Sequence, residues 1–224
     1  MKKIQDSFYK NKTWSAKTDS YFEEQLRRTR STVSKAEYLQ IQGCILLESA
    51  EPKFQEVGLV LLQRLLDDYP NEYVSIITAQ EKLGDYFFKK LDFQAAAEKF
   101  KIVTDFCNKQ HSRAGTSTAA DLKWAASLLA IHSPEALIEA SAIITAFPVA
   151  LCKTEQHIFN YNKLAAFIHA SLSQKEAAAQ YAKAALDAAE KIKLAAVNNP
   201  KNEAVKANEL FIERLVEISI NQDF

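Results

Sequence analysis

Glycine and proline are scarce in this sequence: its 224 residues include only 4 glycines and 5 prolines. A β-sandwich or β-barrel uses these residues in a turn about every 8 to 12 residues. Nucleotide-binding α/β folds also need glycine in their phosphate-binding loops. The scarcity argues against both classes, and we expect an all-helical protein.

Cysteine is also sparse, and its spacing excludes the usual cysteine frameworks. Cys44, Cys107 and Cys152 are odd in number and far apart, which fits neither a secreted disulfide framework nor a CxxC metal or redox site. A chain of this length can bury roughly 70% of its unfolded surface, so apolar packing can fold it without metal or disulfide. We expect reduced thiols and no cofactor.

Long apolar runs and an excess of one charge are both missing. Uncharged apolar stretches such as 146–152 are far shorter than the roughly 20 residues that span a bilayer. Near the amino terminus, Gln5, Asp6 and Lys10 interrupt any signal-peptide core. The 28 basic and 28 acidic residues cancel, so no long-range field attracts nucleic acid or anionic lipid. These features predict a cytoplasmic protein that binds neither nucleic acid nor membrane.

Small residues recur along the chain at intervals of about 40 residues, and each is followed three positions later by a large apolar residue. These positions are Gly43, Gly84, Ala125 and Ala165. A second small residue follows each one, at Gly58, Ala96, Ala136 and Ala177. Large apolar residues at offsets of three and four share a helical face with the small ones, which let antiparallel helices approach closely. The pattern predicts four helix pairs, near 35–68, 77–107, 118–146 and 156–196.

Prolines agree with these boundaries. Pro70 and Pro148 each follow an aromatic residue at the expected end of a second helix. Pro52 and Pro134 instead lie at expected helix starts, where proline is tolerated in the first turn. Ser133 precedes Pro134 and is expected to cap that helix.

The second and fourth pairs resemble a tetratricopeptide repeat (TPR). The resemblance rests on Gly84 to Phe87 with Asp92 to Ala96, and on the set Ala165, Ile168, Ala177, Tyr181 and Ala184. It covers roughly residues 35 to 195, although segments 109–118 and 149–155 lengthen the usual period of about 34 residues. The resemblance implies a TPR-like right-handed superhelix of antiparallel helix pairs that recognises peptides or proteins without catalysis.

We expect three segments. Residues 1–34 form an N-terminal segment with a helix over Asp19 to Val33, residues 35–197 form the four helix pairs, and residues 198–224 contain a C-terminal helix over 203–220. A helical solenoid needs a terminal cap, which the last helix would supply. A homodimer contact through this last helix is the alternative, so the protein is predicted to be a monomer or a homodimer.

No familiar catalytic motif is present: the sequence lacks GxGxxG, GxxxxGK[ST], HExxH and GxSxG. Cys107 and His111 lie four residues apart and could share a helical face, but a metal site would need two more ligands. We therefore expect no enzyme activity and no metal. The alternative is an enzyme or metal-binding helical protein whose pocket gathers a carboxylate with histidines from the set His111, His132, His157 and His169.

The leading hypothesis is a scaffold that binds a protein or peptide segment on the concave face of the superhelix. In the first helix of each pair, a second stripe of residues lies about 130° from the packing stripe and cannot face the partner helix. This stripe consists, pair by pair, of Glu37, Gln40, Cys44 and Leu47; Thr78, Glu81, Asp85 and Phe88; Ala119, Leu122, Ala126 and Leu129; and Phe159, Asn162, Ala166 and His169. The residues expected to bind the partner are Glu37, Gln40, Glu81, Asp85, Phe88, Leu122, Asn162 and His169. The first half of this concave face is acidic and polar and the second half is more apolar, so we expect a partner segment with basic and apolar residues.

Three alternatives concern this same face. TPR proteins that bind acidic chain ends carry Lys and Asn here, whereas this chain has Gln40 and Cys44 at the matching places, so that ligand class is not expected. A nucleotide-binding helical repeat would need a basic stripe, which the neutral charge disfavours. Finally, the apolar members of the stripe could pack against neighbouring repeats or against the last helix, leaving no open surface there.

Overall fold

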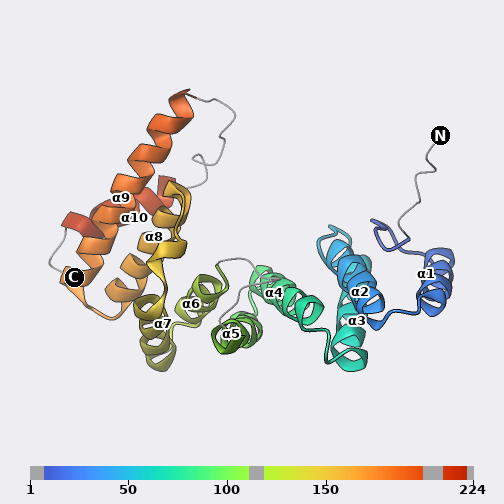
Figure 1. The fold of residues 1–224 in the computed structure, drawn as a ribbon. Coiled ribbons are helices and arrows are strands. Elements are labelled where there is room, and N and C mark those ends of the chain that lie inside the picture. The colour runs from blue at the N-terminus through green and yellow to red at the C-terminus, as the bar shows by residue number, and fades with distance from the viewer. Residues whose placement is uncertain (1–7, 111–118, 199–208, 221–224) are drawn as a thin grey trace. The chain divides into compact units, whose positions relative to one another are not determined.

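The computed structural model describes residues 8–110, 119–198 and 209–220, and Figure 1 shows their helices in chain order. Within these ranges the protein is helical apart from turns and one short 3₁₀ segment, and it has no strand, which confirms the all-helical expectation. The chain divides into two compact units, residues 1–120 and 121–224. Each unit is described by itself below.

Ten α-helices and the 3₁₀ turn make up the described ranges. The first five are α1 (Ala16–Arg28), α2 (Thr32–Leu47), α3 (Pro52–Asp68), α4 (Tyr73–Lys89) and α5 (Phe93–Gln110). They are followed by α6 (Ala120–Ile131), α7 (Pro134–Ala146), η1 (Val149–Leu151), α8 (Glu155–Ser171), α9 (Lys175–Asn198) and α10 (Glu209–Ile220). The four predicted pairs coincide with α2–α3, α4–α5, α6–α7 and α8–α9, with ends displaced by a few residues.

Helix starts follow the predicted capping chemistry. Pro52 and Pro134 occupy the first turns of α3 and α7. The Ser133 hydroxyl accepts a hydrogen bond from the backbone N–H of Ala136 at 3.2 Å. The expected N-terminal helix over Asp19 to Val33 is wrong in both bounds, because Ser15 caps α1 earlier and Ser31 caps α2 within that span. A serine side chain that accepts a backbone N–H starts a new helix where periodicity alone continued the old one.

The first unit is held by close helix crossings at the predicted glycines. A Cβ atom on Gly58 of α3 would lie 2.8 Å from the carbonyl oxygen of Gly43 and 2.8 Å from the amide nitrogen of Leu47, both in α2. A Cβ on Gly84 of α4 would lie 2.6 Å from the ring of Phe100 in α5. Only glycine permits these approaches, so the small-residue pattern marks real crossings in both pairs of this unit.

Leucines fill the core between α2 and α3, and α4 packs against both of these helices. Leu39, Leu46, Leu62 and Leu65 are fully buried in this cluster. The contact between α4 and the preceding pair joins the two pairs of the unit into one body. Consecutive pairs therefore stack in the manner of a helical repeat.

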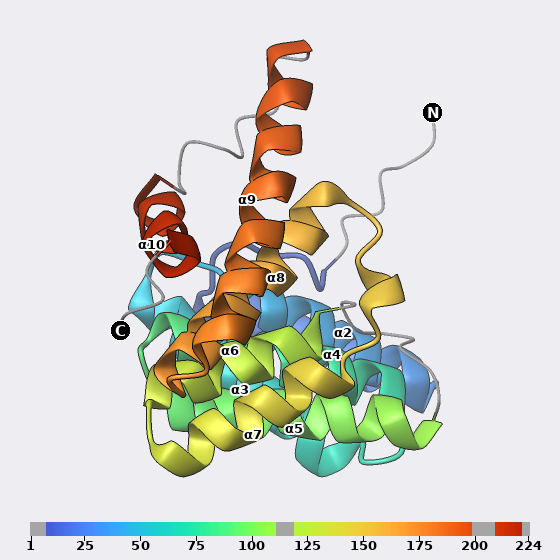
Figure 2. The same cartoon turned by 90° about the vertical axis from the view of Figure 1, so that its left-hand side faces the viewer.

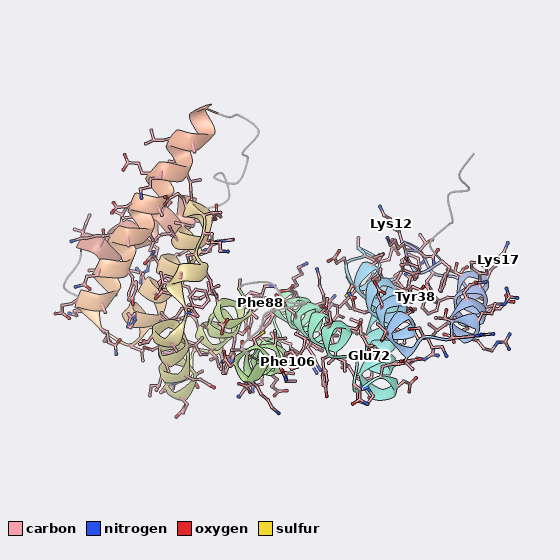
Figure 3. All side chains as sticks on the ribbon, viewed as in Figure 1. Lys12, Lys17, Tyr38, Glu72, Phe88 and Phe106 are labelled. Atoms are coloured by element: carbon pink, nitrogen blue, oxygen red, sulfur yellow. The ribbon has the colours of Figure 1, made fainter. Side chains whose placement is uncertain are left out.

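The N-terminal segment packs onto α2 through a buried glutamine. The side-chain amide of Gln42, which is 0% exposed, accepts a hydrogen bond from the backbone N–H of Asn11 at 2.9 Å. Its Nε2 donates to the backbone carbonyl of Asn11 at 2.7 Å. The rings of Phe8 and Tyr9 pack on Tyr38, which Figure 3 labels on α2. This segment thus packs against α2 through both hydrogen bonds and aromatic rings.

Three helices end in a left-handed residue that is not glycine: Leu91 after α4, His132 after α6 and Ser173 after α8 have φ of 63°, 59° and 57°. After α4, Asp92 N–H donates to the carbonyl of Phe87 and Leu91 N–H to that of Phe88, both at 3.0 Å. These two bonds make a Schellman motif. The same pair of bonds follows α8: Gln174 N–H donates to the carbonyl of His169, and Ser173 N–H donates to the carbonyl of Ala170. The second and fourth pairs therefore share their turn geometry as well as their spacing.

The second unit has an alanine-rich core between α8 and α9. Helix α10 contacts both of these helices, and Figure 2 shows it beside α9. Ala178, Ala182 and Ala185 of α9 are buried, whereas the predicted Ala177 and Tyr181 are only half-buried. The buried stripe is thus displaced by one residue from the prediction. Both α8 and α10 cover α9, so its buried face is centred between them.

The C-terminal helix is described from Glu209 onward, and the predicted start over 203–208 lies outside the described residues. Leu215 and Ile218 of α10 are 0% and 3% exposed and lie in the core of the second unit. Among the described helices, none combines the length and the apolar character that a bilayer span requires.

Candidate functional site

The predicted binding stripe of α2 begins at the surface and becomes buried toward its end. Glu37 is exposed and Gln40 is half-buried, and Gln40 Nε2 lies 3.6 Å from Cys44 Sγ, to which it donates. Cys44 is 8% exposed, and its burial raises the pKa of the thiol. A buried, protonated thiol is a poor nucleophile, so Cys44 acts here as a packing residue.

Side chains of α2 and α4 line a pocket of about 280 Å³ in the first unit, which we call the α2–α4 groove. Cys44 and Leu47 from α2 and Asp85 from α4 belong to the predicted stripe and lie together on its wall. The other lining residues are Glu48, Ser49, Gln55, Lys82, Tyr86, Lys89 and Lys90. First helices of consecutive pairs therefore share one surface that is lined by both polar and apolar groups.

The α2–α4 groove carries both signs of charge. Lys82 Nζ lies 2.7 Å from Glu48 Oε1, which links α4 to the end of α2 across the groove. That hydrogen bond from Lys82 to Glu48 raises the pKa of Lys82. Lys90 Nζ lies 5.5 Å from the ring centre of Tyr86, within cation–π range. Three lysines and two carboxylates thus line the groove, rather than the carboxylates alone that the stripe predicted.

The lysines were missed because the sequence reasoning followed a single stripe of each first helix. Lys82 directly follows the stripe residue Glu81, and Lys89 lies four residues after the stripe residue Asp85. Both lysines line the groove from α4. Their seven-residue spacing puts them on one face of α4. That spacing is the signal that could have found them.

Two other predicted residues of α4 are held more tightly. Glu81 is 7% exposed. Phe88, labelled in Figure 3, is half-buried, and its ring packs edge-on against Phe93 with centroids 5.2 Å apart. Phe93 begins α5, so Phe88 contacts its own partner helix at the turn.

In the second unit, the predicted residues are engaged within their own helix pair or lie half-buried. Leu122 is half-buried on α6. Asn162 Nδ2 donates to the carbonyl of Ile158, one turn earlier in α8, at 2.8 Å. His169 is 8% exposed, stacks on the ring of Tyr181 of α9 and hydrogen-bonds to Gln174. The structure gives Asn162 and His169 local partners and does not gather them with Leu122 in a described pocket.

The last helix covers the stripe of the fourth pair. Phe159 and Ala166, the apolar stripe members of α8, pack in one cluster with Leu215 and Ile218 of α10. Lys163 Nζ lies 4.4 Å from the ring centre of Phe211 of α10, and burial lowers the pKa of Lys163. This is the arrangement that the sequence left open as an alternative, in which apolar stripe residues pack against the last helix.

The histidines named for a catalytic or metal site are in different surroundings. His132 and His157 are exposed, and His169 is buried, while His111 lies outside the described residues. Within the part of the chain that the structure describes, no three or more His, Cys, Asp or Glu side chains group to hold a metal ion.

Comparisons with protein-family models, with curated proteins and with solved structures found no match to this chain. Its function is therefore inferred from its own grooves, pockets and charges.

Proposed function

We propose that this protein is a non-catalytic, TPR-like scaffold that binds a segment of a protein partner in the α2–α4 groove. The observation that carries the proposal is the lining of that groove by first-helix residues of two consecutive pairs, Cys44 and Leu47 with Asp85. In helical repeats the row of first helices forms the extended surface on which partners bind.

The packing of the first unit supports this assignment. The glycine crossings hold each pair together through its second helix, so the opposite side of the first helices remains available for a ligand. The lining combines half-buried Tyr86 and Leu47, which is 6% exposed, with three lysines and two carboxylates. Protein-binding surfaces combine apolar and polar groups in this way.

The charges of the groove select the partner. Glu48 already pairs with Lys82, whereas Lys89 is exposed at the last position of α4. We infer that the bound segment carries acidic side chains toward Lys89 and Lys90 and an apolar side chain toward Leu47. This differs from the basic segment expected from the stripe alone, because the flanking lysines outnumber the carboxylates.

The second unit offers an internal parallel. In α8 the equivalent stripe is covered by α10, whose Leu215 and Ile218 contact Phe159 and Ala166. A helix of this same chain thus occupies the position that we assign to a partner segment in the first unit. The bound segment is accordingly proposed to be short and helical or extended.

The test is a selection of random dodecapeptides on the immobilised protein, followed by calorimetry of the selected peptides. We expect acidic, apolar-centred peptides, and we expect Lys89→Glu to weaken their binding about tenfold because it reverses a charge at the groove. Lys53→Glu is the matched control: Lys53 is exposed on the second helix α3 and is not among the residues that line the groove. Reversal of Glu81 is avoided, since that side chain is 7% exposed and its replacement would disturb folding.

A failed selection, or equal loss of peptide binding in Lys53→Glu and Lys89→Glu, would contradict the proposal. Circular dichroism of each variant checks that the helices remain folded. Binding that survives Lys89→Glu unchanged would move the site away from the groove.

A further inference from the structure

A second, larger pocket lies in the second unit and is distinct from the α2–α4 groove. Its volume is about 650 Å³, and residues of α6, α8, α9 and α10 or their ends line it. We call it the C-terminal pocket. Pockets that hold small organic ligands range over about 300 to 1,000 Å³, so this one is large enough for a ligand of that class.

Most of the C-terminal pocket is apolar. Phe167 and Ala170 come from α8, Leu129 from the end of α6, and Phe211 and Ile218 from α10. The rings of Phe167 and Phe211 are 6.0 Å apart and face each other at a tilt. A body of hydrocarbon or aromatic carbon placed here would be removed from water on several sides, which is the main favourable term for such ligands.

The charged residues of this pocket are all basic. Lys175 and Arg214 line it, and no Asp or Glu is among its described lining residues. Lys175 is the first residue of α9, where the helix dipole adds positive potential. Arg214 pairs with Glu217 along α10, with Nη1 2.6 Å from Oε2. Glu176, next to Lys175, is exposed and does not line the pocket.

Lys175 is the better-placed cation for a ligand. It is half-buried and makes no ion pair with any described residue, whereas Arg214 is engaged with Glu217. A half-buried ammonium beside apolar walls is stabilised by an anionic partner more than a fully solvated one would be. Two serines also line the pocket: Ser171 is the last residue of α8, and Ser173 lies in the turn before α9.

We propose that the C-terminal pocket binds a small anionic amphiphile, whose apolar aliphatic or aromatic body lies against the rings of Phe167 and Phe211 and whose carboxylate or sulfonate lies at Lys175. The ends of α6 and α8, the start of α9 and one side of α10 form this pocket, and this enclosure by four helices suits a compact ligand better than a peptide chain. The site is independent of the proposed scaffold function, and either can fail without the other.

The test uses two fluorescent probes with the same aromatic body and titrates each into the full-length protein. One is 8-anilinonaphthalene-1-sulfonate, which is anionic, and the other is N-phenyl-1-naphthylamine, which is neutral. We expect saturable binding of one sulfonate probe per chain, about tenfold tighter than the neutral probe. Lys175→Glu is expected to remove that difference by weakening the sulfonate alone, and Ser171→Trp to block both probes by filling the pocket mouth.

Lys183→Glu is the matched control, because Lys183 is exposed on the same helix and does not line the pocket. It should leave both affinities unchanged. Thermal melting followed by circular dichroism establishes that each variant is folded, and Lys175→Glu remains informative if Ser171→Trp does not fold. Equal affinity for the two probes, unchanged sulfonate binding in Lys175→Glu, or the absence of saturable binding would each overturn the proposal.

Discussion

The absence of a side chain at Gly58 allows the close crossing of α2 and α3. An added Cβ there would lie 2.8 Å from each of two backbone atoms of α2, and backbone atoms cannot rotate away as a flexible side chain can. Gly84 differs, since its added Cβ would meet the side-chain ring of Phe100. Gly58 is therefore required by the backbone of α2, whereas a larger residue at Gly84 would displace the ring of Phe100.

Gly58→Ala is expected to destabilise the protein by about 1–2 kcal/mol. Alanine gains about 1 kcal/mol in helix propensity, but overpacking of a tight contact costs about 1–3 kcal/mol and more where the neighbours are rigid. Urea unfolding of the first unit, followed by circular dichroism, measures the difference. Glu56→Ala, at an exposed site of the same helix, should change stability by less than about 0.5 kcal/mol. A stabilised Gly58→Ala protein would mean that α2 and α3 are not so close.

The left-handed residue Leu91 makes the opposite prediction. Its φ is 63° and its side chain is 73% exposed, so leucine has backbone strain of about 1–2 kcal/mol there with little burial to offset it. Leu91→Gly is expected to raise the stability by about 0.5–1 kcal/mol, after the larger chain entropy of unfolded glycine is subtracted. The change is read from the urea midpoint. Lys90→Gly, at a negative φ of −83°, should give no gain; a gain at both sites would refute the strain argument.

At the scale of the element, α10 is anchored by a few apolar side chains. Leu215 and Ile218 are buried, while Leu210 and Ile220 are 82% and 69% exposed at the two ends. The exposed Arg214–Glu217 pair contributes little to stability, as surface ion pairs generally do. The docking of α10 on α8 and α9 therefore depends chiefly on its central turn.

Leu215→Ala should release α10 from the second unit. Truncation of a fully buried leucine costs about 2–5 kcal/mol, which is comparable to what one short helix can gain from docking. Hydrogen exchange measured by mass spectrometry is expected to show lost protection over 209–220 and increased exchange near Phe159. Val216→Ala, at a 38% exposed position of α10, serves as the comparison and should leave protection intact. If α10 stays protected in Leu215→Ala, its anchor lies elsewhere.

At the scale of the whole molecule, each unit has its own core. The cluster of the first unit is built around Leu39, Leu46, Leu62 and Leu65, and that of the second around Phe159 and the alanines of α9. These clusters share no residue. Local stability can differ between such bodies, because each opens with its own free energy.

Leu62→Ala is expected to lower the protection of α2 and α3 while leaving α8 and α9 unchanged. Leu62 is 0% exposed, and its loss costs about 2–5 kcal/mol within the first core. Ile168→Ala, at an equally buried site of the second unit, should give the reciprocal pattern. Hydrogen exchange of both variants makes the comparison, and parallel loss of protection in both units would show that the chain unfolds as one cooperative body.

Much of the helical architecture could be predicted because it depends on local chemistry. Helix periodicity placed the four pairs, Pro52 and Pro134 marked two starts, and Ser133 capped a helix as expected. Gly43 and Gly58 identified a crossing that the structure contains. The capping and proline signals lie within one or two turns of the residues concerned, and the crossing glycines lie on helices that are adjacent in sequence, so a single sequence is sufficient to read them.

The sequence by itself determined that the chain forms helices, where most of them begin and end, and which small residues lie at crossings. Only the tertiary structure decided which faces stay open. It covered Phe159 and Ala166 with α10, brought Lys82 and Lys89 beside Cys44 and Leu47, and gathered residues of four helices around the C-terminal pocket. The physical reason is that helix propensity and capping act between neighbours in sequence, whereas exposure depends on packing between residues tens of positions apart.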